Sequence, residues 1–552
     1  MAYCPRRLAG IFVFSFLWLL CAAVFALPVQ PELFDGIGIN QLWQHEPNLA
    51  GQGVNVAVIC RSMTYINGMP QNDYRPDVTH DCLADIKFDL QNDSQFLAGT
   101  SPHATAVCSI LFGKDWQPVA NNFEELSYRG LVSDANAEVI EFWHFLKNQV
   151  FNNSRPDADV LSFSIGSVFD DWWTRGIEAL AEQYGTTIVA GIGNGSSVYD
   201  LPLYPAAGSN VIAVGVVEQT KNGFNWAKSE RSTGGPTEDN RCKPDIVAPG
   251  NYLAAVAFEP NQYQYTGDYS SFATPAVAGT AALLIQKAQT EPNAGEILTG
   301  PNGNCAVKAI LMNTAAKLPY WHKGKLGSED DHEVPLDLMH GSGVLDAFGA
   351  YNTLTAGRYE PGEAADEGWD LNNVEQGLEN VYQFSVSEPN NKTIVVTLAW
   401  NRHYQKRYPF ERDEEKDVDL KLELLAYDKN GNSFLLDYSD SEADNVEHIY
   451  IPADANYVNY EIVVSIADEA NPESVITEDY GIAWRVIETD KQNDISWFDL
   501  NRDGGIDKND IAVLLENASK FQRGSADYLI GDINNDGMID VKDISMFARR
   551  IR

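Results

Sequence analysis

Three polar residues in the middle of the chain have types and positions suited to acyl-transfer chemistry. Ser271 comes just before an apolar helical run at 275–289, and a serine at a helix start lies near free backbone N–H groups that can stabilise an oxyanion. His103 also stands at a helix entrance, where its ring can act as a general base. Asn194 follows an apolar strand and can donate a side-chain N–H. Taken singly, these residues could equally be a helix cap, a surface histidine and a turn residue.

Near the C-terminus, a twelve-residue pattern rich in oxygen-bearing side chains occurs twice, at 499–510 and 532–543. These side chains fall at positions 1, 3, 5, 9 and 12, and a glycine at position 6 permits a tight turn. The spacing suits Ca²⁺, which takes about six to eight oxygens, one of them here the backbone carbonyl at position 7. We therefore expect two calcium ions. The expected ligands are Asp499, Asn501, Asp503, Gly505, Asp507 and Asp510 in the first loop, and Asp532, Asn534, Asp536, Met538, Asp540 and Asp543 in the second.

The segments that must hold the serine, the histidine and the asparagine alternate between strands and helices across residues 27–358. Near-continuous apolar runs at 54–59, 186–192 and 210–217 indicate strands buried on both faces of a parallel sheet. The run at 105–112, like the helical run after the serine, indicates a buried helix. The sequence therefore predicts a doubly wound α/β domain.

Together these segments resemble the subtilisin-like (S8) serine peptidases. The resemblance rests on the blocks HATAVCS and YSSFATPAVAG, supported by LSFSIGS, YPAAGSNVIAVGVV and GSGVLDA. It implies that Ser271 is the nucleophile, His103 the general base and Asn194 the oxyanion donor. It also implies that an extended peptide pairs by strand addition with the segment Ser164, Ile165 and Gly166.

One position departs from the pattern of that family. Its first strand ends with the triad aspartate, and the corresponding residue here is Cys60. Loss of that carboxylate costs about 10⁴-fold in well-studied proteases, because it fixes the imidazole tautomer and stabilises the imidazolium. A Cys60 thiolate favoured by Arg61 could replace it in part by orienting His103. Otherwise Cys60 is a buried thiol, or forms a disulfide with Cys82 or Cys108.

Two further modules are expected after the α/β domain. Residues 359–490 alternate short β-rich runs with turns, which favours an antiparallel β-sandwich. They resemble the jelly-roll domains that follow many subtilase domains, and we expect a stabilising role rather than substrate recruitment or a spacer. The acidic stretch 411–419 could hold calcium or form a solvated loop. Residues 491–552 carry both calcium loops and resemble a type I dockerin, which implies a small α module and a cohesin-bearing partner.

The N-terminus indicates the location of the protein. Arg6 and Arg7 precede an apolar run that ends in a small-residue cleavage site at Ala26. We therefore expect a signal peptide over 1–26, a secreted or cell-surface protein, and no membrane contact after cleavage; a membrane anchor is the alternative. The formal net charge of −39 argues against nucleic acid and anionic membranes as partners.

The sequence supports two functions. The first is a secreted serine endopeptidase, attenuated by Cys60, that acts on a peptide or protein substrate and is tethered to a cohesin through a calcium-dependent dockerin. The alternative is a catalytically inactive pseudoprotease, which keeps the cleft as a peptide-binding or structural module of the same assembly.

Overall fold

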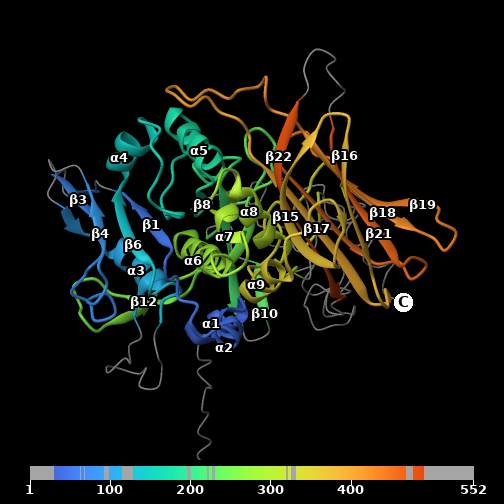
Figure 1. Cartoon of the computed structure of the whole chain (residues 1–552). Helices are drawn as coiled ribbons and strands as arrows, with labels where there is room; N and C mark the ends of the chain where they lie inside the picture. The colour runs from blue at the N-terminus through green and yellow to red at the C-terminus, as the bar shows by residue number, and fades with distance from the viewer. Residues whose placement is uncertain are drawn as a thin grey trace, which may run out of the picture.

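The computed structural model (Figure 1) describes most of the chain between residues 30 and 489. The described ranges are 30–61, 64–66, 69–92, 98–114, 129–195, 200–220, 223–226, 231–318, 321–324, 331–467 and 476–489. The expected signal peptide over 1–26 and both expected calcium loops therefore lie outside the described residues. Within these ranges, no helix is long and apolar enough to cross a membrane.

An eight-stranded, almost entirely parallel sheet forms the centre of the first part of the chain. The strands lie in the order β10-β9-β8-β7-β1-β6-β4, with β11 paired to β9, and within this described sheet only β10 is antiparallel to its neighbour. The three expected apolar strands correspond to β1, β8 and β9, so the predicted α/β sheet is confirmed. The bounds are β1 (Asn55–Cys60), β4 (Asp89–Gln91), β6 (Asn136–Glu141), β7 (Val160–Phe163), β8 (Thr187–Gly191), β9 (Ile212–Thr220), β10 (Gly223–Trp226) and β11 (Ile246–Pro249).

Both faces of this sheet are covered by helices. Successive side chains of a strand point to opposite faces. Val56 therefore joins a cluster that includes α3 (Pro102–Phe112) and α6 (Ser270–Ala288). Ala57 joins the cluster on the other face, which includes α5 (Trp172–Tyr184). Because both faces are buried, the strands read as continuous apolar runs rather than as alternating ones.

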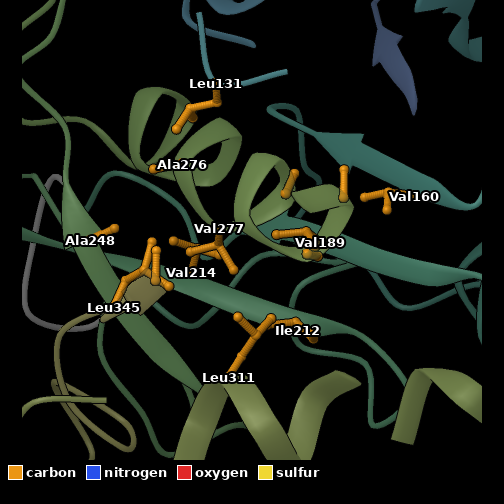
Figure 2. Close-up of a cluster of buried hydrophobic side chains, with 14 of the residues drawn as sticks. Leu131, Val160, Val189, Ile212, Val214, Ala248, Ala276, Val277, Leu311 and Leu345 are labelled. Atoms are coloured by element: carbon orange, nitrogen blue, oxygen red, sulfur yellow. The ribbon is translucent and has the colours of Figure 1, made fainter. Parts of the chain in front are cut away.

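Helix α6 lies across the sheet and contacts β7, β8, β9, β11 and α3. Figure 2 shows Ala276 and Val277 on this helix within the buried cluster that also contains Val189 and Val214 of the sheet. Full burial of one such valine is worth roughly 1.5–3 kcal/mol. The small residues of α6 allow a close approach of neighbouring segments, since a Cβ added at Gly279 would lie 2.8 Å from the Cβ of Leu131. This packing fixes the position of the N-terminus of α6.

Further elements surround the sheet. They are α1 (Gln30–Gly36), α2 (Ile39–His45), β2 (Thr64–Ile66), β3 (Met69–Arg75), β5 (Ala98–Thr100), α4 (Phe142–Phe145), the π-helical turn η1 (Leu146–Val150), β12 (Leu253–Ala255), β13 (Tyr263–Tyr265), α7 (Ala294–Leu298), α8 (Gly303–Asn313) and α9 (Ala347–Ala356).

Residues 362–488 form two sheets that share one hydrophobic cluster. The first has the strand order β14-β16-β21-β18-β19 and the second β15-β22-β17-β20. Trp400, Trp484 and Tyr382 are among the largest fully buried side chains between them. The bounds are β14 (Gly362–Glu363), β15 (Glu367–Glu375), β16 (Glu379–Ser385), β17 (Lys392–Trp400), β18 (Leu420–Tyr427), β19 (Ser433–Ser439), β20 (Val446–Pro452), β21 (Asn459–Ile466) and β22 (Thr477–Glu488).

The second sheet packs directly on α8, as Figure 1 shows for β15, β17 and β22. A Cβ added at Gly481 of β22 would lie 2.3 Å from backbone atoms of α8, so only glycine fits at this crossing. At the end of α8, Asn313 Nδ2 donates to Val395 O at 3.1 Å and to Ala483 O at 3.0 Å. The two parts of the chain therefore share a tight, hydrogen-bonded junction.

The acidic stretch 411–419 pairs with basic side chains. Lys416 Nζ lies 2.5 Å from Asp413 Oδ2, and Arg412 forms an ion pair with Asp417. Asp417 also accepts a hydrogen bond from His403 N at 2.9 Å. No three acidic, histidine or cysteine side chains of the described ranges are grouped so as to hold a metal ion.

Candidate active site

Ser271 is the second residue of α6, where backbone N–H groups have no partner within the helix. Four residues later, Pro275 supplies no N–H, so the Ser271 carbonyl also lacks its helical partner. Ser164 fills that place, because its Oγ donates to Ser271 O at 2.7 Å. In return, Ser271 Oγ donates to Ser164 O at 3.3 Å. The expected nucleophile is therefore held against the expected peptide-pairing segment.

Asn194 follows β8 and lies beside the start of α6. Its Oδ1 accepts hydrogen bonds from Ser270 N at 2.9 Å and from Ser270 Oγ at 3.0 Å. A backbone N–H can only donate, so this contact fixes which end of the amide is the oxygen. The Nδ2 group is then directed away from Ser270 and is available to an oxyanion next to Ser271. Ser270 thus holds the side chain of Asn194 in place.

His103 is the second residue of α3. Ser101 caps this helix by accepting a hydrogen bond from Ala104 N at 3.1 Å. The imidazole lies near α6, since its centroid is 5.7 Å from the ring centroid of Phe272, the residue after Ser271. The side chain as a whole is exposed, yet the surrounding protein removes enough water to lower the pKa of His103 below its ordinary value. The neutral ring that a general base requires is thus favoured.

The described contacts include no hydrogen bond between His103 and Ser271. The serine proton instead points to the Ser164 carbonyl. Catalytic hydrogen bonds in substrate-free enzymes are often long or misaligned, so this arrangement does not remove His103 as the base. It does mean that Ser271 must rotate its hydroxyl from Ser164 toward His103 before it can attack.

Cys60 ends β1 and is buried, with 5% of its surface exposed. Burial raises the pKa of its thiol to about 12, so the group is neutral at physiological pH despite the adjacent Arg61. The disulfide alternative is wrong for the structure, because Cys60, Cys82 and Cys108 are all free and buried. A neutral thiol cannot stabilise a neighbouring imidazolium as a carboxylate does. Burial therefore disfavours the thiolate interpretation.

Glu141 lies beside Cys60 on the adjacent strand β6. Its carboxylate is buried and lies, like Cys60, at the C-terminal end of its strand. It is therefore the side chain to consider as a substitute for the missing aspartate. Both of its oxygens are already engaged, since they accept hydrogen bonds from Trp143 N at 2.9 Å and His144 N at 2.8 Å. Glu141 therefore serves as the N-cap of α4, and the described contacts include no hydrogen bond between Glu141 and His103.

Ser164, Ile165 and Gly166 follow β7 directly, next to the start of α6. Ser164 is buried, Ile165 is half-buried and Gly166 is exposed. The next residue, Ser167, exchanges two backbone hydrogen bonds with Tyr204, each of 2.8 Å. The structure thus brings Ser271, Asn194 and the expected peptide-pairing segment together, with His103 on the neighbouring helix.

Comparison with known proteins identifies the family of the chain. The model of the subtilase family matches residues 51–350. The serine protease AprX of Bacillus subtilis is 28% identical over 161 residues, which cover 25% of this chain and 36% of that protein. Pyrolysin of Pyrococcus furiosus is 26% identical over 241 residues, 37% of this chain and 17% of that protein. The chain thus spans about a third of the length of AprX and about a sixth of the length of pyrolysin.

Among solved structures, that of the Clostridium perfringens CspB protease aligns with 59% of this chain and 99% of its own, at 13% identity and a TM-score of 0.42. The family model covers more than half of the sequence, including the segments of Ser271, His103 and Asn194. The chain therefore belongs to the subtilase family.

Proposed function

We propose that this protein is a serine endopeptidase with reduced turnover. The observation that carries the proposal is the arrangement at Asn194, in which Ser270, the neighbour of Ser271, donates twice to the amide oxygen, so that Nδ2 is the end of the amide left to serve an oxyanion. Preorganised donors of this kind supply a large share of catalysis in acyl transfer. A chain that had lost all catalytic use of the site would have no need to hold the amide in this way.

In the proposed reaction, Ser271 Oγ attacks the peptide carbonyl and its proton passes to His103. The carbonyl oxygen becomes an oxyanion, held by the Ser271 N–H and Asn194 Nδ2. His103 then gives the proton to the leaving amine as the C–N bond breaks. Water, deprotonated by His103, releases the acyl group from Ser271 and restores the serine.

Cys60 explains why turnover would be slow. The imidazolium formed at His103 has no carboxylate behind it, and loss of that carboxylate costs about 10⁴-fold in comparable enzymes. About 10³-fold acceleration over water can still come from the oxyanion site and substrate binding. We therefore expect weak activity rather than none.

The second candidate function is a pseudoprotease that binds peptides without cleaving them. Two observations favour it, namely the neutral thiol of Cys60 and the hydroxyl of Ser271 directed to Ser164 O. In this case the cleft would capture an extended peptide by strand addition and hold it.

Labelling with a fluorophosphonate separates the two functions. Labelling of the native protein that is lost in Ser271→Ala supports the peptidase. Labelling that appears only in Cys60→Asp supports the pseudoprotease, because the site is then complete except for one residue. Absence of labelling in both proteins contradicts the assignment of Ser271 as nucleophile.

We further propose that the protein is secreted and is tethered to a cohesin-bearing partner by residues 491–552. The support is the pair of calcium-loop patterns at 499–510 and 532–543. The twelve ligands named above would bind two calcium ions and order the two loops. If chelation with excess EDTA leaves cohesin binding unchanged, this tether is excluded.

The jelly-roll-like sheets of residues 362–488 would then act mainly as a stabilising part of the enzyme. The junction with α8 supports this role, since Gly481 packs against the backbone of Cys305 and Ala306, and Asn313 donates to Ala483 O. A spacer would not require a contact that only glycine can make.

A further inference from the structure

The β-sandwich carries a groove that has no part in the proposed peptidase reaction. Its volume is about 940 Å³, within the range of about 300–1,000 Å³ that is usual for ligand pockets. Strands β16, β21 and β18, which are neighbours in one sheet (Figure 1), line its middle. Strand β14, the turn after β18 and the loop before β21 line its rim. The other sheet packs on α8, so the groove belongs to the outer sheet of the sandwich.

The polar side chains of this groove hold one another in place. Gln383 of β16 lies opposite Glu461 of β21, and its Nε2 donates to Glu461 Oε1 at 2.8 Å. Tyr427 of β18 donates its hydroxyl to the other carboxylate oxygen of Glu461. Two residues further along β16 and β21, Ser385 Oγ donates to Asn459 Oδ1 at 2.8 Å. Such contacts fix side-chain orientations before a ligand arrives, which lowers the entropic cost of binding.

The same side chains keep donors and acceptors for a ligand. Gln383 and Asn459 are both exposed, and among the described contacts neither Gln383 Oε1 nor Asn459 Nδ2 has a partner. Apolar surface lies beside them, since the ring of Tyr427 is half-buried and Val458 is 50% exposed. The groove therefore combines neutral hydrogen-bonding groups with an aromatic face.

The charges of the groove narrow the class of ligand. Four carboxylates and one ammonium line it, those of Glu363, Asp366, Asp428, Glu461 and Lys429. This excess of negative charge disfavours anions such as nucleic acids, phosphopeptides and acidic sugars.

A cationic ligand is also a poorer match than a neutral one, because two of these carboxylates are already engaged. Glu461 accepts from Gln383 and Tyr427. Asp428 Oδ1 accepts from Asn430 N at 2.8 Å and from Asn432 N at 2.9 Å. A cation would compete with these bonds, whereas a neutral ligand leaves them intact.

We propose that this groove is a binding site for neutral oligosaccharides. A sugar has hydroxyls that both donate and accept hydrogen bonds, and apolar C–H faces that can pack on an aromatic ring. The ring of Tyr427 receives such a face, while Asn459 Nδ2 and Gln383 Oε1 bind hydroxyls. A free polysaccharide and the glycan of a glycoprotein share this chemistry. The site is separate from Ser271, so it does not depend on the peptidase activity.

The test compares hexamers of different charge, titrated into the full chain by calorimetry. Cellohexaose, xylohexaose, mannohexaose and maltohexaose are the neutral probes, hexagalacturonate is the anionic probe and hexalysine is the cationic probe. We expect at least one neutral probe to bind with a Kd of about 1 mM or tighter, and at least about tenfold more tightly than hexagalacturonate. Binding of glycosylated ribonuclease B but not of unglycosylated ribonuclease A would assign the site to glycoproteins. Binding of neither would assign it to free polysaccharides.

Variants of the groove locate the binding. Tyr427→Ala and Asn459→Ala should each weaken binding of the neutral probe by about five- to tenfold. Tyr427→Phe keeps the ring and should stay within about threefold of the native affinity. Phe434→Ala is the matched control, because Phe434 is an aromatic residue of the same sheet, 43% exposed, that does not line the groove. It should leave the affinity unchanged.

Three results would overturn the assignment. The first is that no neutral probe binds. The second is that hexalysine binds more tightly than every neutral probe, which would make the groove a site for basic peptides. The third is that Tyr427→Ala and Asn459→Ala both fold and bind the neutral probe as tightly as Phe434→Ala does.

Discussion

Ser164 and Ser271 exchange two hydrogen bonds, Ser164 Oγ to Ser271 O at 2.7 Å and Ser271 Oγ to Ser164 O at 3.3 Å. The first of these exists because Pro275 cannot donate to the Ser271 carbonyl within α6. The second occupies the hydroxyl of the proposed nucleophile. One residue of the peptide-pairing segment therefore both supports the start of α6 and holds the serine in a resting orientation.

Ser164→Ala should destabilise the protein. The change leaves the Ser271 carbonyl without a partner in a largely buried place, which costs about 1–3 kcal/mol. The free energy of unfolding, measured by urea denaturation, checks this prediction. Ser167→Ala is the control, because Ser167 Oγ accepts only an exposed bond of 3.3 Å from Phe169 N, and a loss as large in the control would contradict this account.

Cys60→Asp should raise kcat by about 10³–10⁴-fold, since an aspartate there would stabilise the imidazolium of His103. A fluorogenic peptide is the substrate to use. Cys60→Ser controls for the loss of sulfur and should change kcat by less than about threefold. If the aspartate variant folds but gains no activity, a defect other than Cys60 limits the site.

Asn194→Ala should lower kcat by about 10²–10³-fold with little change in KM, because the amide acts on the oxyanion and not on the bound substrate. Ser270→Ala removes one of the two bonds that hold Asn194 Oδ1 and keeps the backbone bond. Its effect on kcat should therefore be smaller, about tenfold. Equal losses in kcat and in peptide affinity would indicate a collapsed cleft instead.

His403 gives the junction a dependence on alkaline pH. Its two nitrogens lie 2.9 Å from Glu182 Oε1 and 2.8 Å from Glu478 Oε2. Burial alone would lower the pKa of His403, but the two carboxylates outweigh it and raise the pKa to about 10. The imidazolium thus contributes stability that is complete below the unfolded pKa of about 6.5 and is lost as pH rises toward 10.

The measurement for this prediction is the free energy of unfolding between pH 6 and pH 10. The native protein should lose about 1–2 kcal/mol more across this interval than His403→Gln, which has no proton to release. Lys416 and Arg412, on the same loop, have pKa values raised above their ordinary ranges and should stay charged. Parallel pH profiles for the two proteins would show that His403 is not protonated in the fold.

Gly481→Ala should cost several kcal/mol, because its Cβ would lie 2.3 Å from the backbone of α8 and the packed helix cannot move away without loss of contacts. Gly377→Ala is the control, in the turn between β15 and β16, where a Cβ meets nothing within 4 Å and only the φ of +80° is strained. That control should cost about 1 kcal/mol. Thermal unfolding of the two variants gives the comparison.

The sequence predicted the α/β part well, because strands buried on both faces leave continuous apolar runs such as 54–59 and 186–192. Ser271, His103 and Asn194 could be proposed as site residues because they stand at element boundaries within blocks that resemble those of the subtilases. The strands expected between 379 and 487 are likewise present as β16, β17, β18, β20, β21 and β22.

Other features depend on contacts between segments that are distant in sequence, so no local sequence pattern predicts them. The support of Asn194 by Ser270 spans 76 residues, and that of Ser271 by Ser164 spans 107 residues. The state of Cys60 could not be predicted, because a disulfide-bonded, an ionised and a buried neutral cysteine have the same letter and no distinct local pattern.

The crossing of Gly481 over α8 has a consequence for how the protein can be divided. A chain cut after residue 358 would keep α8 but leave the face that contacts β22 and β17 exposed to water, with Asn313 deprived of the carbonyls of Val395 and Ala483. The peptidase part and the two following sheets should therefore melt in a single transition, and neither should be exchangeable for a homologous piece unless both surfaces are exchanged together.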